Sequence, residues 1–120
     1  MSYDAGMDKP TALKVFESLS SPVRLEIFCE LVHSGMNGMV AGELGAAIGV
    51  PANALSFHLK SMRSAGLVTA ESEGRYQRYR ANVSHMLRLL AFVTENCCYK
   101  AQAPARKVAR ARAARPRARS

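Results

Sequence analysis

The sequence of 120 residues has no tryptophan, only three cysteines and no uninterrupted apolar run of eighteen residues. The last absence excludes a membrane-spanning helix by the usual length criterion. The first ten residues also lack the basic and apolar regions of a secretory signal. We therefore expect a cytosolic protein that does not bind membranes. Because cysteines are kept reduced in the cytosol, a structural disulfide is disfavoured.

Sequence features of an active site are missing as well. There is no glycine-rich phosphate loop and no pair of carboxylates at a useful spacing. Cys97 and His85 could form a nucleophile and base, but no orienting acid or set of oxyanion donors accompanies them. The sequence therefore predicts that the protein is not an enzyme.

Acidic residues are absent from positions 101–120, which contain seven of the 17 lysines and arginines. Without this segment, 10 basic residues face 9 acidic ones, and the net charge falls from +8 to +1. Such an alanine- and arginine-rich segment cannot bury enough apolar surface to fold. We expect a flexible N-terminus over 1–9, one folded domain over 10–100 and a disordered basic tail over 101–120. The tail favours nucleic acid over an anionic membrane, because it has no bulky apolar side chains.

The spacing of apolar residues predicts four helices before residue 66. The second helix has Ser21 as its N-cap, Pro22 at its first position and Gly35 at its end. A short turn joins the third and fourth helices, as is typical of a helix-turn-helix. The apolar residues that share one face of their helix are Leu13, Phe16 and Leu19; Leu25, Phe28, Leu31 and Val32; Leu44, Ala47 and Ile48; and Leu55, Leu59 and Met62. We expect the sets of the last three helices to face the core.

The period of the pattern changes after residue 66. Two strand-like runs flank Glu73 and Gly74, which predicts a β-hairpin. Helical spacing then returns from Val83, and the apolar face of this last helix consists of Met86, Leu89, Leu90 and Val93. The predicted fold is mainly α with a small β-hairpin: a winged helix-turn-helix in the order α-α-α-α-β-β-α.

The outward face of the fourth helix suits base recognition. Asn53 and Ser56 can hydrogen-bond to base edges, Phe57 can contact a thymine methyl group, and a lysine can reach a phosphate or guanine. The hairpin supplies cations where a wing would meet the DNA backbone or minor groove. The predicted DNA-binding residues are Asn53, Ser56, Phe57, His58 and Lys60 on the helix and Arg75, Tyr76 and Arg78 on the hairpin.

Each of these features has a simpler explanation when taken alone. A charged hairpin is often a solvated edge strand that resists aggregation, and a single histidine is often a structural hydrogen-bonding residue. Their order and spacing together favour DNA recognition. A winged-helix module that binds another protein is the alternative, with a tail that only adds non-specific affinity for nucleic acid.

Three segments, SSPVRLEIFCELV, ALSFHLKSMRSAGLV and EGRYQRYRAN, resemble the arsenic-responsive ArsR/SmtB family of winged-helix repressors. The resemblance extends from about Thr11 to Cys98. Members are homodimers that bind operator DNA in the apo state and leave it when an inducer binds. The resemblance therefore implies a homodimeric repressor of double-stranded DNA, whose two recognition helices enter successive major grooves. It also implies a dimer interface built from the apolar faces of 13–19 and 86–93.

The cysteines are the candidate sensor. Some members of the family carry a Cys-x-Cys pair before the recognition helix, and this sequence has none there. Others use a vicinal pair after a TEN-like stretch together with a third cysteine downstream. Cys97 and Cys98 in TENCCYK resemble that pair, but the downstream thiol is missing. The only other thiol is Cys29, a possible third ligand that we expect to be a partly buried packing residue.

Vicinal thiolates favour soft ions. The expected inducer is trivalent arsenic or antimony, as arsenite, antimonite or methylarsenite, and no permanent cofactor is expected. A divalent metal such as zinc could use His85 and Glu95 in addition to the pair, although no spaced motif supports it. Oxidation of the two thiols and simple packing in the dimer interface are further alternatives.

Overall fold

The computed structural model describes residues 7–98, with side chains described as far as Glu95. The predicted basic tail over 101–120 lies outside the described residues. At the other end, Met7 is buried in the core and the first helix begins at Lys9. The folded part therefore begins slightly before the expected boundary at residue 10.

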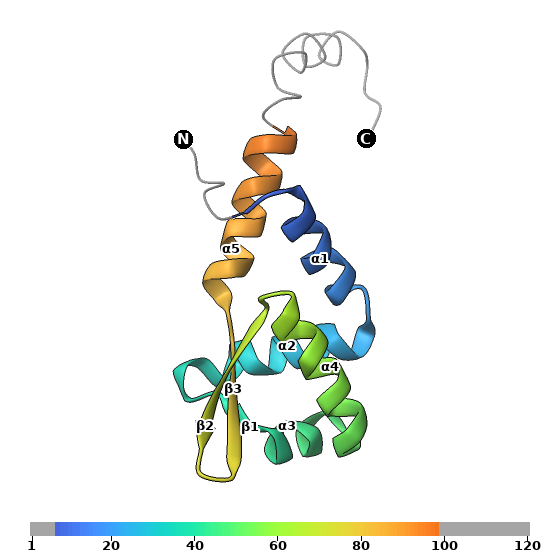
Figure 1. Cartoon of the computed structure of the whole chain (residues 1–120), viewed down its shortest axis with the longest axis vertical. Coiled ribbons are helices and arrows are strands. Elements are labelled where there is room, and N and C mark those ends of the chain that lie inside the picture. Colours follow the sequence, from blue (N-terminus) through green and yellow to red (C-terminus); the bar gives the residue numbers. More distant parts are fainter. Residues whose placement is uncertain (1–6, 99–120) are drawn as a thin grey trace, which may run out of the picture.

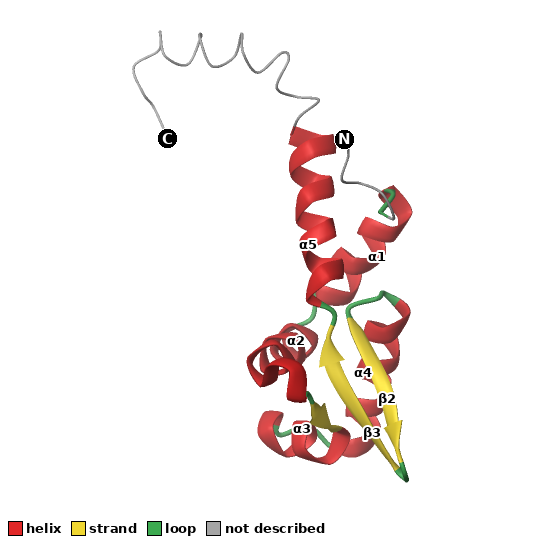
Figure 2. Ribbon diagram, turned by 90° about the vertical axis from the view of Figure 1, so that its left-hand side faces the viewer, coloured by secondary structure: helices red, strands yellow, loops and turns green. Residues whose placement is uncertain are grey.

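The predicted order of helices, hairpin and final helix is confirmed (Figures 1 and 2). One short strand and two irregular helical segments are added to it. The elements are α1 Lys9–Leu19, α2 Pro22–Ser34, the 3₁₀ turn η1 Gly35–Asn37, β1 Met39–Val40, α3 Ala41–Ile48, α4 Ala52–Ser64, β2 Val68–Glu73, β3 Tyr76–Ala81, α5 Val83–Phe92 and the π-helical segment η2 Val93–Cys98. Within this range, no helix is long and apolar enough to cross a membrane.

Side-chain caps fix where the first two helices begin. Asp8 accepts a hydrogen bond from the backbone N–H of Thr11 at 3.0 Å, and hydrogen bonding to Thr11 lowers the pKa of this carboxyl. Ser21 accepts one from the N–H of Arg24 at 3.2 Å, as the sequence predicted. The chain therefore turns sharply between α1 and α2 without leaving these donors unpaired.

The three strands form an antiparallel sheet in the order β1-β3-β2. β2 and β3 make the wing hairpin, with Glu73 opposite Tyr76 next to the turn. β1 pairs Met39 with Tyr79 and Val40 with Arg78. A two-residue strand has no periodicity to detect, which is why the sequence did not predict it. This pairing attaches the connection between α2 and α3 to the wing.

One core joins all the helices, and α4 is oriented by it. Leu55, Leu59 and Met62 of α4 are buried as predicted. They pack into a cluster with residues of the other elements, among which Val15, Ile27, Leu31, Leu44 and Leu67 are fully buried. Because this stripe fixes the rotation of α4, the opposite face of the helix must point to solvent.

The predicted inward faces are wrong for part of α2 and α3. Leu25, Val32 and Ala47 are exposed, whereas Ile27 is buried. α2 carries apolar residues on more than one face, and spacing alone does not say which stripe meets the core. On α1 the buried residues are Ala12, Val15 and Ser18. Leu13 and Phe16 are instead 63% and 49% exposed in the single chain.

Gly38 lies at the entrance to β1, where the backbone approaches β3 very closely. Its φ is 63°, in the region that favours glycine, and an added Cβ would collide with the carbonyl oxygen of Tyr79 and lie 2.7 Å from Cγ of Arg80. Gly35 has a similar φ of 60°, but an added Cβ would meet no atom within 4 Å. A comparison of alanine substitutions at Gly35 and Gly38 therefore distinguishes the cost of backbone strain from the cost of steric conflict.

We predict that Gly38→Ala lowers the free energy of unfolding more than Gly35→Ala does. Backbone strain alone should cost on the order of 1–3 kcal/mol in either variant. Gly38→Ala must in addition push β1 away from β3. Urea denaturation of the two variants measures the difference, and equal losses would contradict the close approach of these strands.

Candidate nucleic-acid interface and sensor segment

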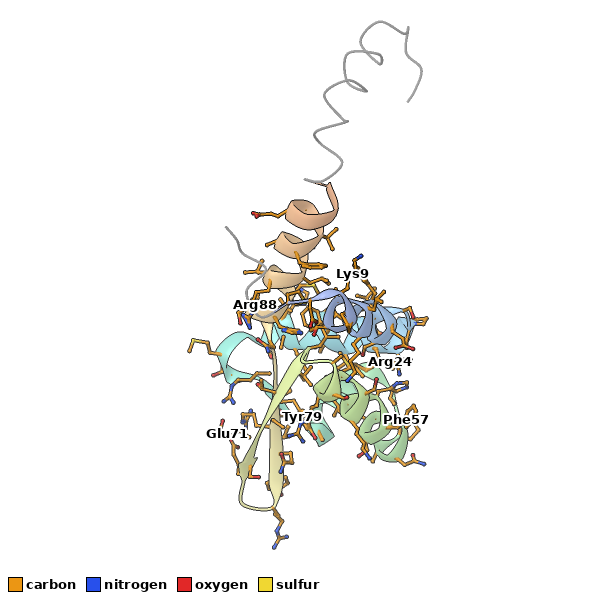
Figure 3. The ribbon with its side chains drawn as sticks, turned by 45° about the horizontal axis from the view of Figure 1, so that its top comes forward. Lys9, Arg24, Phe57, Glu71, Tyr79 and Arg88 are labelled. Carbon is orange, nitrogen blue, oxygen red and sulfur yellow. The ribbon has the colours of Figure 1, made fainter. Side chains whose placement is uncertain are left out.

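The outward face of α4 carries four of the predicted DNA-binding residues. Asn53, Ser56, Phe57 and Lys60 are all exposed, and Phe57 is 67% exposed despite its size. Figure 3 shows Phe57 directed away from the body of the domain. An exposed aromatic side chain between polar ones suits contact with base edges and methyl groups in a groove.

His58, the fifth predicted residue of this helix, has a different environment. It is half-buried, and its Nδ1 lies 3.0 Å from Nη1 of Arg24 on α2. A guanidinium can only donate, so Nδ1 is the acceptor in this hydrogen bond. Nε of Arg24 also donates to the carbonyl oxygen of Ser18 at 2.7 Å. His58 therefore links the recognition helix to α1 and α2, and its contact with bases stays a prediction.

The two predicted DNA-binding arginines of the wing differ in whether they already make an ion pair. Arg75 is exposed at the turn beside Tyr76, and it makes no ion pair within residues 7–98. Arg78 instead bonds Glu73 at 2.8 Å and the carbonyl oxygen of Asn37 at 3.1 Å. The hydrogen bond to Glu73 raises the pKa of Arg78 above its already high value, so the side chain stays charged. Only the tip of the wing is therefore ready for a phosphate without rearrangement.

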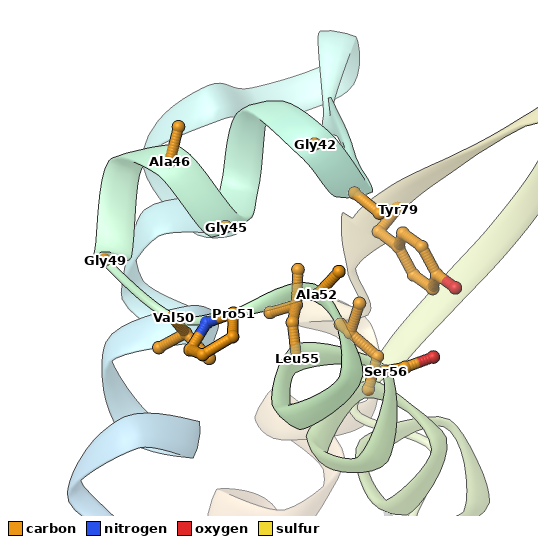
Figure 4. A pocket seen from close by; sticks show the side chains of 12 residues that line it. Gly42, Gly45, Ala46, Gly49, Val50, Pro51, Ala52, Leu55, Ser56 and Tyr79 are labelled. Carbon is orange, nitrogen blue, oxygen red and sulfur yellow. The ribbon is translucent and has the colours of Figure 1, made fainter.

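A hollow of about 480 Å³ lies between α3 and the beginning of α4. Figure 4 shows it between α3, the beginning of α4 and Tyr79 of β3. It stays open because α3 contributes only small residues to its wall, including Gly42, Gly45 and Ala46. Ser56 lies at its edge. Ser56 of the polar face of α4 thus borders a hollow whose walls are mainly apolar.

The last helix changes its hydrogen-bonding pattern before the cysteines. α5 is a regular helix as far as Phe92, and η2 continues it as a π-helix through Cys97 and Cys98. Such π-helical turns are rare and occur often at functional sites. The side chains of Cys97 and Cys98 lie outside the described residues, so their role as ligands stays a prediction.

Cys29 is exposed on α2, so the expectation of a partly buried packing residue is wrong. Figures 1 and 2 show α2 beneath the beginning of α5, while η2 rises away from the winged-helix body. Within one chain, the vicinal pair is therefore not brought to Cys29. The predicted third ligand would have to meet the pair across a dimer.

The zinc alternative finds no support in the described side chains, among which no group of three or more histidine, cysteine or acidic residues could hold a metal ion. His85 lies at the first turn of α5, and Glu95 lies ten residues further along. That separation corresponds to about 15 Å along a helix axis. The Nε2 atom of His85 is buried without a hydrogen-bond partner in the described range, and the ring packs over Gly66.

Asn82 joins the beginning of α5 to the end of α4. Its Oδ1 caps α5 through the N–H of His85, and its Nδ2 donates to the carbonyl oxygen of Gly66 at 2.9 Å. Its backbone N–H donates to Leu67 at 2.8 Å. Sequence reasoning missed this residue, although an asparagine directly before an apolar helix is an N-cap signal. It missed Arg24 as well, whose link to His58 spans 34 positions and leaves no sequence pattern.

Comparison with known proteins agrees with this architecture. A family model described as a helix-turn-helix domain matches residues 19–71. The HTH-type transcriptional regulator CmtR of Mycobacterium tuberculosis is 32% identical over 85 residues, which are 70% of this chain and 69% of that protein. The arsenical resistance operon repressor of Bacillus subtilis is 34% identical over 83 residues, which are 69% of this chain and 75% of that protein.

Solved structures give the same result. An ArsR-like transcriptional regulator from Rhodococcus sp. RHA1 superposes with a TM-score of 0.71 and 27% identity, covering 90% of this chain and 96% of that one. The homodimeric winged helix-turn-helix DNA-binding domain Mb0332 from Mycobacterium bovis has a TM-score of 0.60 and 26% identity, with coverage of 78% and 83%. With its helix-turn-helix, wing and relatives, the chain belongs to the ArsR/SmtB family of winged helix-turn-helix transcriptional repressors.

Proposed function

We propose that the protein is a homodimeric repressor that binds operator DNA in its apo state and is released when a trivalent arsenical binds Cys97 and Cys98. The observation that carries this proposal is the placement of two features in one domain. An exposed polar face of α4 and a cationic wing tip lie at one end, and a π-helical segment with vicinal cysteines lies at the other. The arsenical resistance operon repressor among its relatives supports the choice of inducer.

The exposed apolar residues of α1 and α5 support the dimer. Leu13 and Phe16 of α1 and Leu87 and Leu90 of α5 lie exposed on the two helices that the family uses for its interface. Large apolar side chains on neighbouring helices favour association, because burying them removes apolar surface from water. Two copies would then be related by a two-fold axis, and each would present one α4 to a half-site. The homodimer of Mb0332 supports the same arrangement.

In the proposed complex, α4 lies in the major groove and Arg75 follows the backbone beyond it. Asn53 and Ser56 would then read base edges, and Lys60 and Arg75 would contact phosphates. The repressor would act in the cytoplasm.

Release of DNA would begin at η2. Ligation of both thiolates by one soft ion would reorder the π-helical turn and shift α5 in the dimer interface. Asn82 would carry that shift to the end of α4 through its bond to Gly66. Because both half-sites must be occupied with the correct spacing, a small change in the angle of either helix lowers affinity for the operator.

Oxidation of the same two thiols is the second candidate trigger, since it would use the same helix and interface. The divalent-metal alternative would need ligands that the described side chains do not bring together. If the protein were instead a protein-interaction module, the polar face of α4 would have no sequence-specific DNA to bind.

The dimer interface can be tested at Leu90, which is 53% exposed in the single chain. We predict that Leu90→Lys folds normally but weakens dimerisation at least tenfold, because association would bury an unpaired charge. Sedimentation equilibrium measures the dissociation constant. Met36→Lys is the control, since Met36 is also exposed but lies on η1, which packs against α2 and β3. Equal dimerisation of both variants would contradict this interface.

The DNA-binding face can be tested by two substitutions with different signatures. We predict that Asn53→Ala lowers discrimination at one base pair by about 1–3 kcal/mol and leaves the salt dependence unchanged. Arg75→Ala should weaken binding to all sequences and reduce the slope of log affinity against log salt by about one. Fluorescence anisotropy with promoter DNA and a scrambled duplex measures both. A protein-interaction module would show no sequence preference to lose.

The sensor can be tested with reduced protein bound to its operator. We predict that Cys97→Ser and Cys98→Ser each abolish release by arsenite or methylarsenite while apo affinity stays unchanged. Release is followed by anisotropy as each metalloid is added in the absence of oxidant. Cys29→Ser is the matched thiol control and also tests the third ligand. An unchanged response in Cys29→Ser eliminates Cys29, and an unchanged response in both other variants overturns the proposed sensor.

A further inference from the structure

A second cavity, of about 340 Å³, opens on the flank of α4 that faces away from the wing. It lies between α1, the beginning of α2 and α4, and we call it the α1–α4 cavity. The polar and charged side chains that line it are Lys14, Glu17, Ser18, Arg24, Ser61 and Ser64. Phe57 of the DNA-reading face also lines it, so the cavity opens beside the proposed groove contact.

The polar groups of this cavity are mostly donors. Arg24 is held by its bonds from Nε to Ser18 and from Nη1 to His58, which leaves Nη2 as the nitrogen available to a ligand. Lys14 reaches Oγ of Ser64 only at 3.4 Å, a long contact that an anion could replace. The carboxylate of Glu17 opposes these charges, but this side chain is exposed and can remain in water.

Within residues 7–98, Ser18 adds an unpartnered hydroxyl to the wall of this cavity. It is only 5% exposed, and its Oγ has no hydrogen-bond partner in the described part of the chain. A buried hydroxyl without a partner is unfavourable. Ser18 lines the α1–α4 cavity, so a change of its rotamer would bring this hydroxyl to an acceptor bound there.

We propose that the α1–α4 cavity binds a phosphate group. A fixed guanidinium, a mobile ammonium and several hydroxyls are the groups that proteins use to surround a tetrahedral oxyanion. The phosphate comes either from the operator backbone beside α4 or from a free phosphate ion. In both cases it ties α1, a helix of the proposed dimer interface, to the recognition helix. Binding of an operator phosphate rests on the proposed function, whereas binding of a free phosphate ion does not.

The first experiment omits DNA, so its result can be interpreted even if the protein does not bind an operator. Reduced full-length protein is titrated with inorganic phosphate and followed by ¹H–¹⁵N correlation spectra, with chloride at matched ionic strength as the reference. We expect saturable shifts of the amides around Ser18 and Ser64. Lys14→Gln should weaken this binding at least tenfold. Lys9→Gln, at an exposed lysine of the same helix outside the cavity, should not.

The second experiment measures the salt dependence of affinity for promoter DNA. A backbone phosphate in the cavity predicts that Lys14→Gln lowers the slope by about one, while Lys9→Gln leaves it unchanged. A free-phosphate site predicts the spectral shifts without a change in slope. Absence of both effects overturns the proposal, and so does an equal effect of the two lysine variants in both experiments.

Ser18→Ala separates binding from folding. The variant should bind phosphate several-fold more weakly than the wild type, because it lacks the hydroxyl that the anion accepts from. Its resistance to urea should be equal or higher, because a buried hydroxyl without a partner has been removed. Unaltered phosphate affinity together with lower stability would show that Ser18 serves packing alone, and would contradict the proposed contact.

Discussion

The hydrogen bonds of Asn82 hold the two functional ends of the domain together. This side chain caps α5 and bonds Gly66 at the end of α4, and its backbone bonds Leu67 at the beginning of the wing. A third contact secures the junction, because the ring of His85 covers Gly66 so closely that an added Cβ would lie 2.8 Å from it. The recognition helix, the wing and the last helix therefore share one anchoring point, and none can rotate without moving the others.

A second connection runs along the opposite flank of α4. Arg24 joins His58 to the carbonyl end of α1, and the α1–α4 cavity lies beside this bond. The recognition helix is thus held between α5 through its end and α1 through its middle. Both of these helices belong to the proposed dimer interface. In the proposed mechanism, a change at that interface would reach α4 by two routes: the hydrogen bonds of Asn82 to the backbone after α4, and the side chain of Arg24.

Local signals in the sequence predicted most of the fold, and long-range contacts account for what they missed. Ser21 and Pro22 marked the beginning of α2, and the stripe of Leu55, Leu59 and Met62 gave the rotation of α4 correctly. The stripe of α2 was misassigned because Leu25 and Ile27 are equally apolar, and only packing decides between them. The half-burial of His58 depends on Arg24, 34 positions away. The π-helical turn at the cysteines also has no signature in residue spacing.

The ion pairs of the wing influence how quickly the protein finds DNA. Glu71 with Arg80 and Glu73 with Arg78 lie at 2.6 and 2.8 Å, so each pair acts as a dipole whose field decays within a short distance. The folded domain therefore contributes little electrostatic steering, and residues 101–120 carry most of the excess positive charge. In the proposed repressor, the rate of encounter with an operator and the residence time on it would therefore be set by different parts of the chain.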